Sequence, residues 1–209
     1  MKVPYTSFKK IISDNKNEYT KKFLKTLNVG NYINGKECSK FESNFAKFCS
    51  VKFASGTSNG TCALRMGIEE LKLKEGSEII TPPNSFIAST SSIIKANLIP
   101  KFVDISEDWN INVDLIEQAI TKNTKAIMAV HLTGRPAKMD LICSIAKKYN
   151  LFVIEDAAQS FGAKLKNKKV GSYGDFGCFS LHPLKNLFSF GDGGMIVSNK
   201  KSFIKNINI

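Results

Sequence analysis

Residues 171–199, GSYGDFGCFSLHPLKNLFSFGDGGMIVSN, decide how the rest of the chain can fold. This segment contains two apolar runs, at 176–181 and 195–198, which are typical of buried strands. Between them lie a turn with Lys185 and a glycine-rich loop. Lysine is normally found where its ammonium group stays in water. A lysine held between buried strands loses its proton more easily and can form a Schiff base. A surface lysine on a hairpin is the simpler alternative.

Upstream, short apolar runs alternate with helical patterns. The runs at 51–54, 78–81, 99–105, 125–132 and 151–155 predict five strands, and the two in the opening segment make seven. Helical periodicity is present at 39–49, 62–71, 87–96, 114–120 and 139–149. Continuous apolar strands separated by helices are typical of strands buried on both faces of a sheet. We therefore predict an α/β fold, a three-layer sandwich with a mostly parallel seven-stranded sheet.

The first 40 residues are polar and rich in lysine. Residues 14–27 predict a helix with apolar side chains on one face. At the start of the next helix, Ser39 and Glu42 have the spacing of a capping box.

Composition is ordinary for a globular protein: of 209 residues, 43% are hydrophobic and 23% are charged. No apolar run approaches the roughly 20 residues that span a bilayer, and the first residues lack the apolar core of a signal peptide. The five cysteines are scattered, as expected of reduced thiols. We expect a cytoplasmic protein without a membrane partner.

The net charge of +12 raises the possibility of nucleic-acid binding. However, Arg65 and Arg135 are the only arginines, and arginine is the usual reader of bases and phosphates. The lysines are spread along the chain, which favours a solvated surface and no nucleic-acid partner.

Ligands of parallel α/β sheets bind beyond the carboxyl ends of the strands. At the first such end, residues 58–62 (SNGTC) could bind an anion with the N–H groups of a helix start, or could simply cap the helix. Asp156 ends an apolar strand and needs a cationic or N–H partner, although it could cap the next helix turn. Phe86 follows another strand and could stack on a ring or belong to the core. The two histidines, His131 and His182, are isolated, so we expect no metal site.

Together these groups suit one ligand. Pyridoxal 5′-phosphate (PLP) requires an anion site for its phosphate, an aromatic face, a carboxylate at its ring nitrogen and a lysine for its aldehyde. Each motif alone is weak, but the set in this order predicts PLP.

From about residue 29 onward, the chain closely resembles the DegT/DnrJ/StrS family of fold-type-I, PLP-dependent sugar aminotransferases. The matching segments are GNYINGKECSKFESNFAKF, SNGTCAL, EIITPPNSFIAS, IPKFVDI, TKAIMAVHLTGRPAKMDLI, VIEDAAQSFGA, GSYGDFGCFSLHPLKN and GDGGMIV. The resemblance implies that Lys185 is the Schiff-base lysine and that Asp156 binds the pyridine nitrogen. The other cofactor-binding residues that it implies are Gly60, Thr61, Cys62, Phe86, Gln159 and Ser180. His182 and Asn186 are expected near the substrate.

The resemblance also implies an activity, in which an amino acid, by family habit glutamate, gives its amino group to a keto group of a nucleotide-linked deoxysugar. The product would serve polysaccharide or related sugar biosynthesis. Related dehydratases carry histidine in place of the lysine, so Lys185 favours transamination. Members are homodimers with shared active sites. By this resemblance, residues 1–40 are an N-terminal segment packing on a large PLP-binding domain, 41–209.

Members of the family are longer, with a small C-terminal domain that is not expected in these 209 residues. A catalytically incomplete PLP-binding fragment or a regulatory subunit is therefore the main alternative. Another PLP reaction, such as cysteine desulfuration, is a further one, but it would need a cysteine in a mobile loop. Cys178 lies within an expected strand.

Overall fold

The computed structural model describes residues 3–4 and 6–207. The chain divides into two compact units, Met1–Lys40 and Phe41–Ile209. The first contains α1 (Phe8–Asp14), α2 (Lys16–Val29) and the beginning of α3 (Lys36–Cys49). The expected helix at 14–27 is thus interrupted at Asn15, and α2 ends at Gly30, whose φ of 70° is left-handed.

The predicted capping box is wrong. Helix α3 begins three residues before Ser39, so Ser39 lies inside the helix. The carboxylate of Glu42 instead accepts a hydrogen bond from the N–H of Gly56 at 2.8 Å, which ties α3 to a strand far along the sequence.

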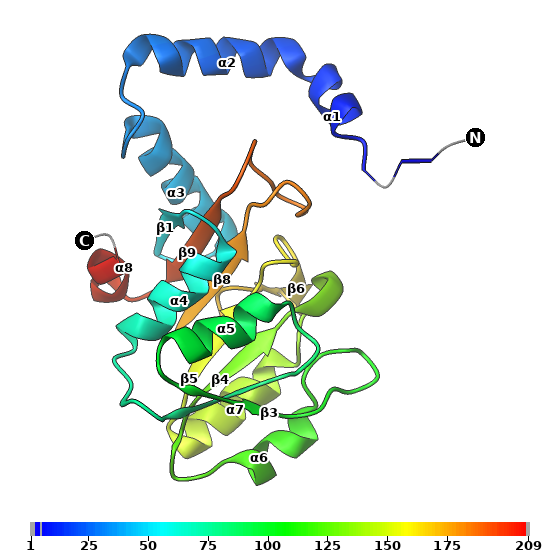
Figure 1. Cartoon of the computed structure of the whole chain (residues 1–209), viewed down its shortest axis with the longest axis vertical. Helices are drawn as coiled ribbons and strands as arrows, with labels where there is room; N and C mark the ends of the chain where they lie inside the picture. The colour runs from blue at the N-terminus through cyan, green and yellow to red at the C-terminus, as the bar shows by residue number, and fades with distance from the viewer. Residues whose placement is uncertain (1–2, 5, 208–209) are drawn as a thin grey trace. The chain divides into compact units, whose positions relative to one another are not determined.

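In the second unit, seven strands form one sheet in the order β1-β9-β8-β5-β4-β2-β3 (Figure 1). Their bounds are Phe53–Thr57, Glu78–Thr81, Ile99–Phe102, Thr124–Val130, Phe152–Asp156, Phe176–Ser180 and Gly194–Ser198 for β1, β2, β3, β4, β5, β8 and β9. The pairs joining β8, β5, β4, β2 and β3 are parallel, and β9 is antiparallel to both of its neighbours. The predicted mostly parallel seven-stranded sheet is confirmed.

The observed strand boundaries differ from the predicted ones by up to three residues, and β1 and β3 show the largest differences. Strand β1 extends through Ser55 to Thr57, where a loop was expected, because these residues pair with β9. Strand β3 ends at Phe102 rather than at residue 105. A two-stranded hairpin, β6 (Lys164–Leu165) and β7 (Lys168–Lys169), carries no strand signal in the sequence.

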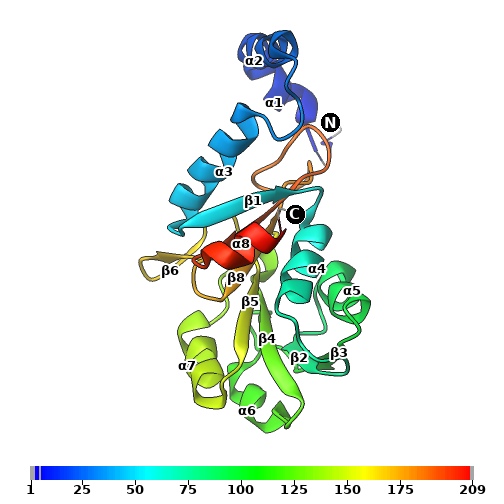
Figure 2. The same ribbon diagram turned by 90° about the vertical axis from the view of Figure 1, so that its left-hand side faces the viewer.

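Helices cover both faces of the sheet. Helices α4 (Gly60–Glu70), α5 (Ile87–Lys95) and α8 (Lys201–Ile207) pack on one face, while α7 (Met139–Tyr149) and α6 (Ile116–Ala119) pack on the other (Figure 2). Two 3-10 turns, η1 (Val113–Leu115) and η2 (Leu132–Gly134), complete the elements. Within β4, Met128 faces the first layer and Ile127 the second, which is why the strand reads as a continuous apolar run. The carboxyl ends of β4, β5 and β8 therefore share one edge with the start of α4.

Candidate active site

A cavity of about 480 Å³ lies at this edge of the sheet. Its size falls within the usual range for small-molecule sites. Eight of the ten predicted site residues border it: Gly60, Thr61, Phe86, Asp156, Gln159, Ser180, His182 and Lys185. The other residues that border it are Asn59, Leu64, Ser85, Ala88, Val130, His131, Ala158, Leu184 and Asp192.

Asp156, the last residue of β5, is 5% exposed. Its Oδ2 accepts a hydrogen bond from the hydroxyl of Ser89 at 2.6 Å, and its Oδ1 accepts one from the N–H of Ala158 at 3.2 Å. Burial raises the pKa of this carboxyl above its ordinary value, and the two hydrogen bonds oppose that rise. Both donors are neutral, so a cationic partner in the cavity would stabilise the carboxylate further.

The start of α4 forms a second wall. Asn59 caps the helix, because its Oδ1 accepts the N–H of Cys62 at 2.8 Å. Cys62 does not border the cavity. A Cβ on Gly60 would come within 2.9 Å of the Cβ of Ser180, so glycine permits β8 and the helix start to approach each other. The hydroxyl-bearing residues Thr61 and Ser180 both face this region.

Lys185 lies in the turn after β8 and is half-buried. Its N–H donates to the carbonyl of His182 at 2.8 Å, which closes the turn. His182 is exposed, and its Nδ1 accepts the N–H of Leu184 at 3.2 Å. Asn186 does not border the cavity, and its Nδ2 donates to the carbonyl of Phe161 at 2.7 Å. The turn therefore presents His182 and Lys185 to the cavity but directs Asn186 elsewhere.

Phe86 and Gln159 complete the predicted set. Phe86 precedes α5 and is 67% exposed, so it belongs to the cavity rim and not to the core. Gln159 Oε1 accepts the N–H of Thr133 at 3.2 Å, which holds the amide beside the cavity.

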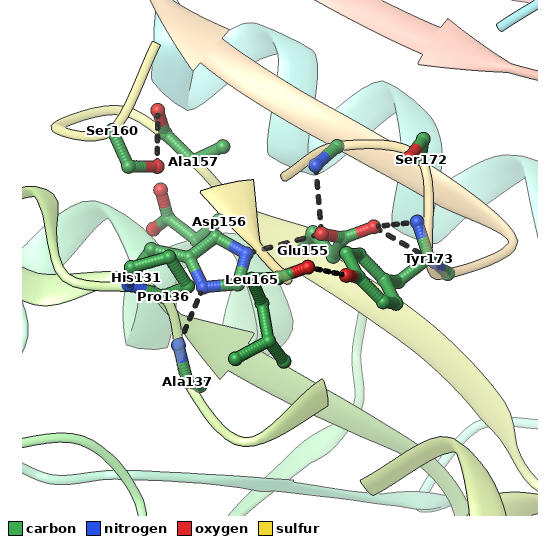
Figure 3. Close-up of polar contacts among 12 residues, drawn as sticks. His131, Pro136, Ala137, Glu155, Asp156, Ala157, Ser160, Leu165, Ser172 and Tyr173 are labelled. Atoms are coloured by element: carbon green, nitrogen blue, oxygen red, sulfur yellow. Dashed lines mark hydrogen bonds and ion pairs between the residues drawn. The ribbon is translucent and has the colours of Figure 1, made fainter. Parts of the chain in front are cut away.

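The sequence interpretation missed several groups of the site. Ser89 is one helical turn beyond Ser85, and their hydroxyls are 2.6 Å apart. That spacing was the available signal that the two hydroxyls approach each other, with Ser85 just before α5 and Ser89 in its first turn. Glu155 is a further group that the sequence interpretation missed, whereas His131 was already considered. Both side chains are fully buried, with 3.1 Å between Glu155 Oε2 and His131 Nε2 (Figure 3). Nothing in the sequence pattern distinguished Glu155 from an ordinary polar residue at a strand end.

An anion-capable helix start, a buried carboxyl, a rim aromatic and a half-buried lysine thus surround one cavity of an α/β domain. This combination defines a domain that can hold a phosphorylated, ring-containing cofactor beside a lysine amine. The chain belongs to the DegT/DnrJ/EryC1/StrS aminotransferase family, whose match covers residues 13–209. Aminotransferases of this family are PLP-dependent.

Individual relatives agree with this assignment. GDP-perosamine synthase of Escherichia coli O157:H7 is 46% identical over 174 residues, which are 83% of this chain and 46% of the relative. The X-ray structure of S. venezuelae DesV, in complex with a ketimine intermediate, matches with a TM-score of 0.95 and 33% identity, over 98% of this chain and 56% of that one. The structure of NtdA from Bacillus subtilis, with bound cofactor PMP, matches with a TM-score of 0.92 and 33% identity. The match covers 99% of this chain and 47% of that one. The chain therefore spans about half the length of these relatives.

Two further observations concern residues 3–4 and 6–207. This part of the chain contains no group of three or more histidine, cysteine or acidic side chains placed to hold a metal ion. None of its helices has the length and apolar character needed to cross a bilayer.

Proposed function

We propose that this chain is the PLP-binding large domain of a sugar aminotransferase. The reaction moves an amino group from an amino acid, glutamate by family habit, to a keto group of a nucleotide-linked deoxysugar. The observation that carries the proposal is that Lys185 and Asp156, which are 29 positions apart in the sequence, border the same cavity. The names of the relatives support a nucleotide-sugar acceptor, since one of them is a GDP-perosamine synthase.

The residues present fit PLP. The buried carboxyl of Asp156 has only neutral hydrogen-bond donors, and a protonated ring nitrogen would supply the missing cation. Thr61 and Ser180 are placed to donate hydroxyl hydrogen bonds to a phosphate at the start of α4. The N–H of Cys62 is engaged by Asn59, so this donor would reach a phosphate only if the cap opened.

Bound PLP supplies an electron sink that stabilises a negative charge on the carbon next to the transferred nitrogen. Asp156 would keep the ring nitrogen protonated, and Phe86 and Gln159 would border the ring. Lys185 would hold the aldehyde carbon through its amine. When free, that amine would move a proton at Cα of the amino acid.

Replacing Lys185 tests this proposal directly. The purified chain is mixed with PLP, reduced with borohydride and digested, and the masses of the peptides are measured by mass spectrometry. We expect a pyridoxyl phosphate adduct on Lys185 of the unsubstituted chain and no adduct at this peptide in Lys185→Ala. Lys47→Ala, which changes an exposed lysine on α3, serves as the matched control and should retain the adduct. An adduct of equal yield elsewhere in Lys185→Ala would refute the role of Lys185.

A PLP-binding fragment or regulatory subunit without turnover is the second candidate. Glutamate, PLP and a nucleotide-linked keto sugar are added, and 2-oxoglutarate is measured. Its formation supports the aminotransferase, whereas cofactor uptake without 2-oxoglutarate supports the second candidate.

We also infer the setting of the reaction. The family resemblance supports a homodimer and a role in polysaccharide or related sugar biosynthesis. The unpaired state of all five cysteines supports the expectation of a reducing, cytoplasmic location.

A further inference from the structure

Glu155 has an unusual environment for a carboxylate. It is 0% exposed, and both of its oxygens accept two hydrogen bonds. Oε1 accepts the N–H groups of Tyr173 and Gly174, each at 2.7 Å. Oε2 accepts the N–H of Gly171 at 2.7 Å and faces Nε2 of His131 at 3.1 Å. Four donors at two oxygens is the pattern of an ionised carboxylate, so the turn at 171–174 acts as an anion nest for a side chain of the same protein.

The contacts of His131 determine its tautomer. Its Nδ1 accepts the N–H of Ala137 at 3.1 Å and must therefore carry a lone pair (Figure 3). Its Nε2 faces a carboxylate that is already an acceptor and must therefore carry the proton. The imidazole is thereby fixed in both orientation and tautomer by groups on two different segments.

This fixed ring adjoins the candidate active site. His131 follows β4, borders the cavity, and donates its backbone N–H to the carbonyl of Asp156 at 3.0 Å. Asp156 is therefore held at its carboxyl by Ser89 and at its backbone by His131. The same Glu155 also anchors the turn from which β8 starts, and β8 leads to Ser180 and Lys185.

We propose that Glu155 and His131 are positioning residues that fix the carboxyl edge of the sheet, where Asp156 meets the strand that leads to Lys185. One buried carboxylate joins the end of β4, the end of β5 and the start of β8. Neither residue reacts with the cofactor or substrate. The inference rests on the proposed function, because positioning is defined here as the effect on PLP binding.

The test uses Glu155→Gln in the full 209-residue chain. A glutamine amide brings two hydrogen atoms toward a site where four donors already converge, so either His131 or the turn loses its acceptor. We expect about tenfold weaker PLP binding, the effect of losing one charge-assisted hydrogen bond. We also expect the ¹⁵N shift of the protonated Nε2 of His131 to change, because it no longer faces a carboxylate, whereas Nδ1 still accepts the N–H of Ala137. Because the chain has two histidines, comparison with His182→Gln assigns the signals.

Tyr173→Phe is the matched control for a loss of stability in the same turn. Its hydroxyl donates to the carbonyl of Leu165 at 2.6 Å, whereas its backbone N–H to Glu155 remains. This variant should lower the thermal midpoint but leave PLP affinity and the Nε2 shift of His131 unchanged. Equal effects of Glu155→Gln and Tyr173→Phe on PLP affinity would overturn the proposal.

If Glu155→Gln does not fold, variants of His131 test the positioning proposal instead. His131→Gln can still donate to Glu155 and accept from Ala137, and should bind PLP within about threefold of the unsubstituted chain. His131→Phe keeps a ring but neither contact, and should lose about tenfold. If His131→Phe binds PLP as tightly as the unsubstituted chain does, the positioning proposal is wrong. Failure of the unsubstituted chain to bind PLP would instead refute the proposed function.

Discussion

Asp156 is subject to two opposing influences at the end of β5. Burial favours its protonated form, whereas the hydroxyl of Ser89 and the N–H of Ala158 favour the carboxylate. The pKa is raised above its ordinary value of 3.8 because burial is the larger effect. An acid whose pKa is higher in the folded than in the unfolded chain stabilises the fold when protonated. That stability is lost as the pH rises from 3.8 through the raised folded value.

Ser89→Ala should enlarge this loss. Without the hydroxyl, the pKa of Asp156 rises further, and the carboxylate loses a charge-assisted hydrogen bond. The free energy of unfolding should therefore fall below that of the unsubstituted chain by about 1 kcal/mol more at neutral pH than in acid. Urea unfolding of the chain without cofactor, repeated between about pH 4 and pH 8, measures the difference.

Ser92→Ala provides the control on the same helix. Ser92 is also buried, but its hydroxyl contacts the carbonyl of Thr61 at 3.4 Å and no titratable group. Its loss of stability should be independent of pH. If both variants show the same pH dependence, Ser89 does not govern Asp156.

At the scale of elements, α4 and β8 form the contact on which the cavity is built. Helix α4 contributes Gly60, Thr61 and Leu64 to the cavity, its N-cap contributes Asn59, and β8 contributes Ser180. Below the cavity, Gly67 of α4 lies against the ring of Phe176, which is fully buried. A glycine is required there because a Cβ would overlap the ring of Phe176.

Gly67→Ala should therefore destabilise the protein, although alanine normally favours a helix over glycine. The overlap should cost about 1–3 kcal/mol, against a gain of at most about 1 kcal/mol from helix propensity. Phe176→Leu makes room for the new methyl group, so the double variant should lose less than the sum of the single variants. Unfolding free energies of the four proteins in urea give this coupling. Strict additivity would show that the two side chains do not compete for space.

At the scale of the whole molecule, the dominant feature is the net charge of +12. Eight ion pairs join the described side chains, and six of them have at least one exposed partner; the exceptions are the buried His131–Glu155 pair and the half-buried Lys101–Glu78 pair. Such pairs contribute little, typically about 0–1 kcal/mol each. Repulsion among the excess lysines is therefore the larger electrostatic effect on stability.

Added salt should stabilise this protein, because it screens the repulsion. Raising NaCl from about 10 mM to about 150 mM shortens the screening length to roughly 8 Å. A gain of about 1 kcal/mol would raise the thermal midpoint by about 2–4 °C. Lys47 and Lys52 are both exposed. In the double variant Lys47→Glu/Lys52→Glu, each substitution lowers the net charge by 2, so the net charge falls from +12 to +8. This variant should respond less to salt, and a midpoint that falls with NaCl in the unsubstituted chain would contradict the argument.

The sequence by itself determined the layers, the strand count of the main sheet and the edge at which most of the predicted site residues lie. Apolar runs separated by helical patterns have one stable arrangement, a sheet covered on both faces, and parallel strands bring their carboxyl ends to one edge. For this reason Asp156, Ser180 and Lys185 could be placed together before their distances were known.

Only the tertiary structure decided the partners of the buried groups. The extension of β1 comes from pairing with β9, and Glu42 binds Gly56 instead of capping its own helix. The environment of Glu155 depends on a turn 16–19 positions away and on a histidine from another strand. Periodicity reports which face of an element is apolar, because burial follows local repeats. It does not report which distant donor meets a given acceptor, because that depends on how the elements approach one another in space.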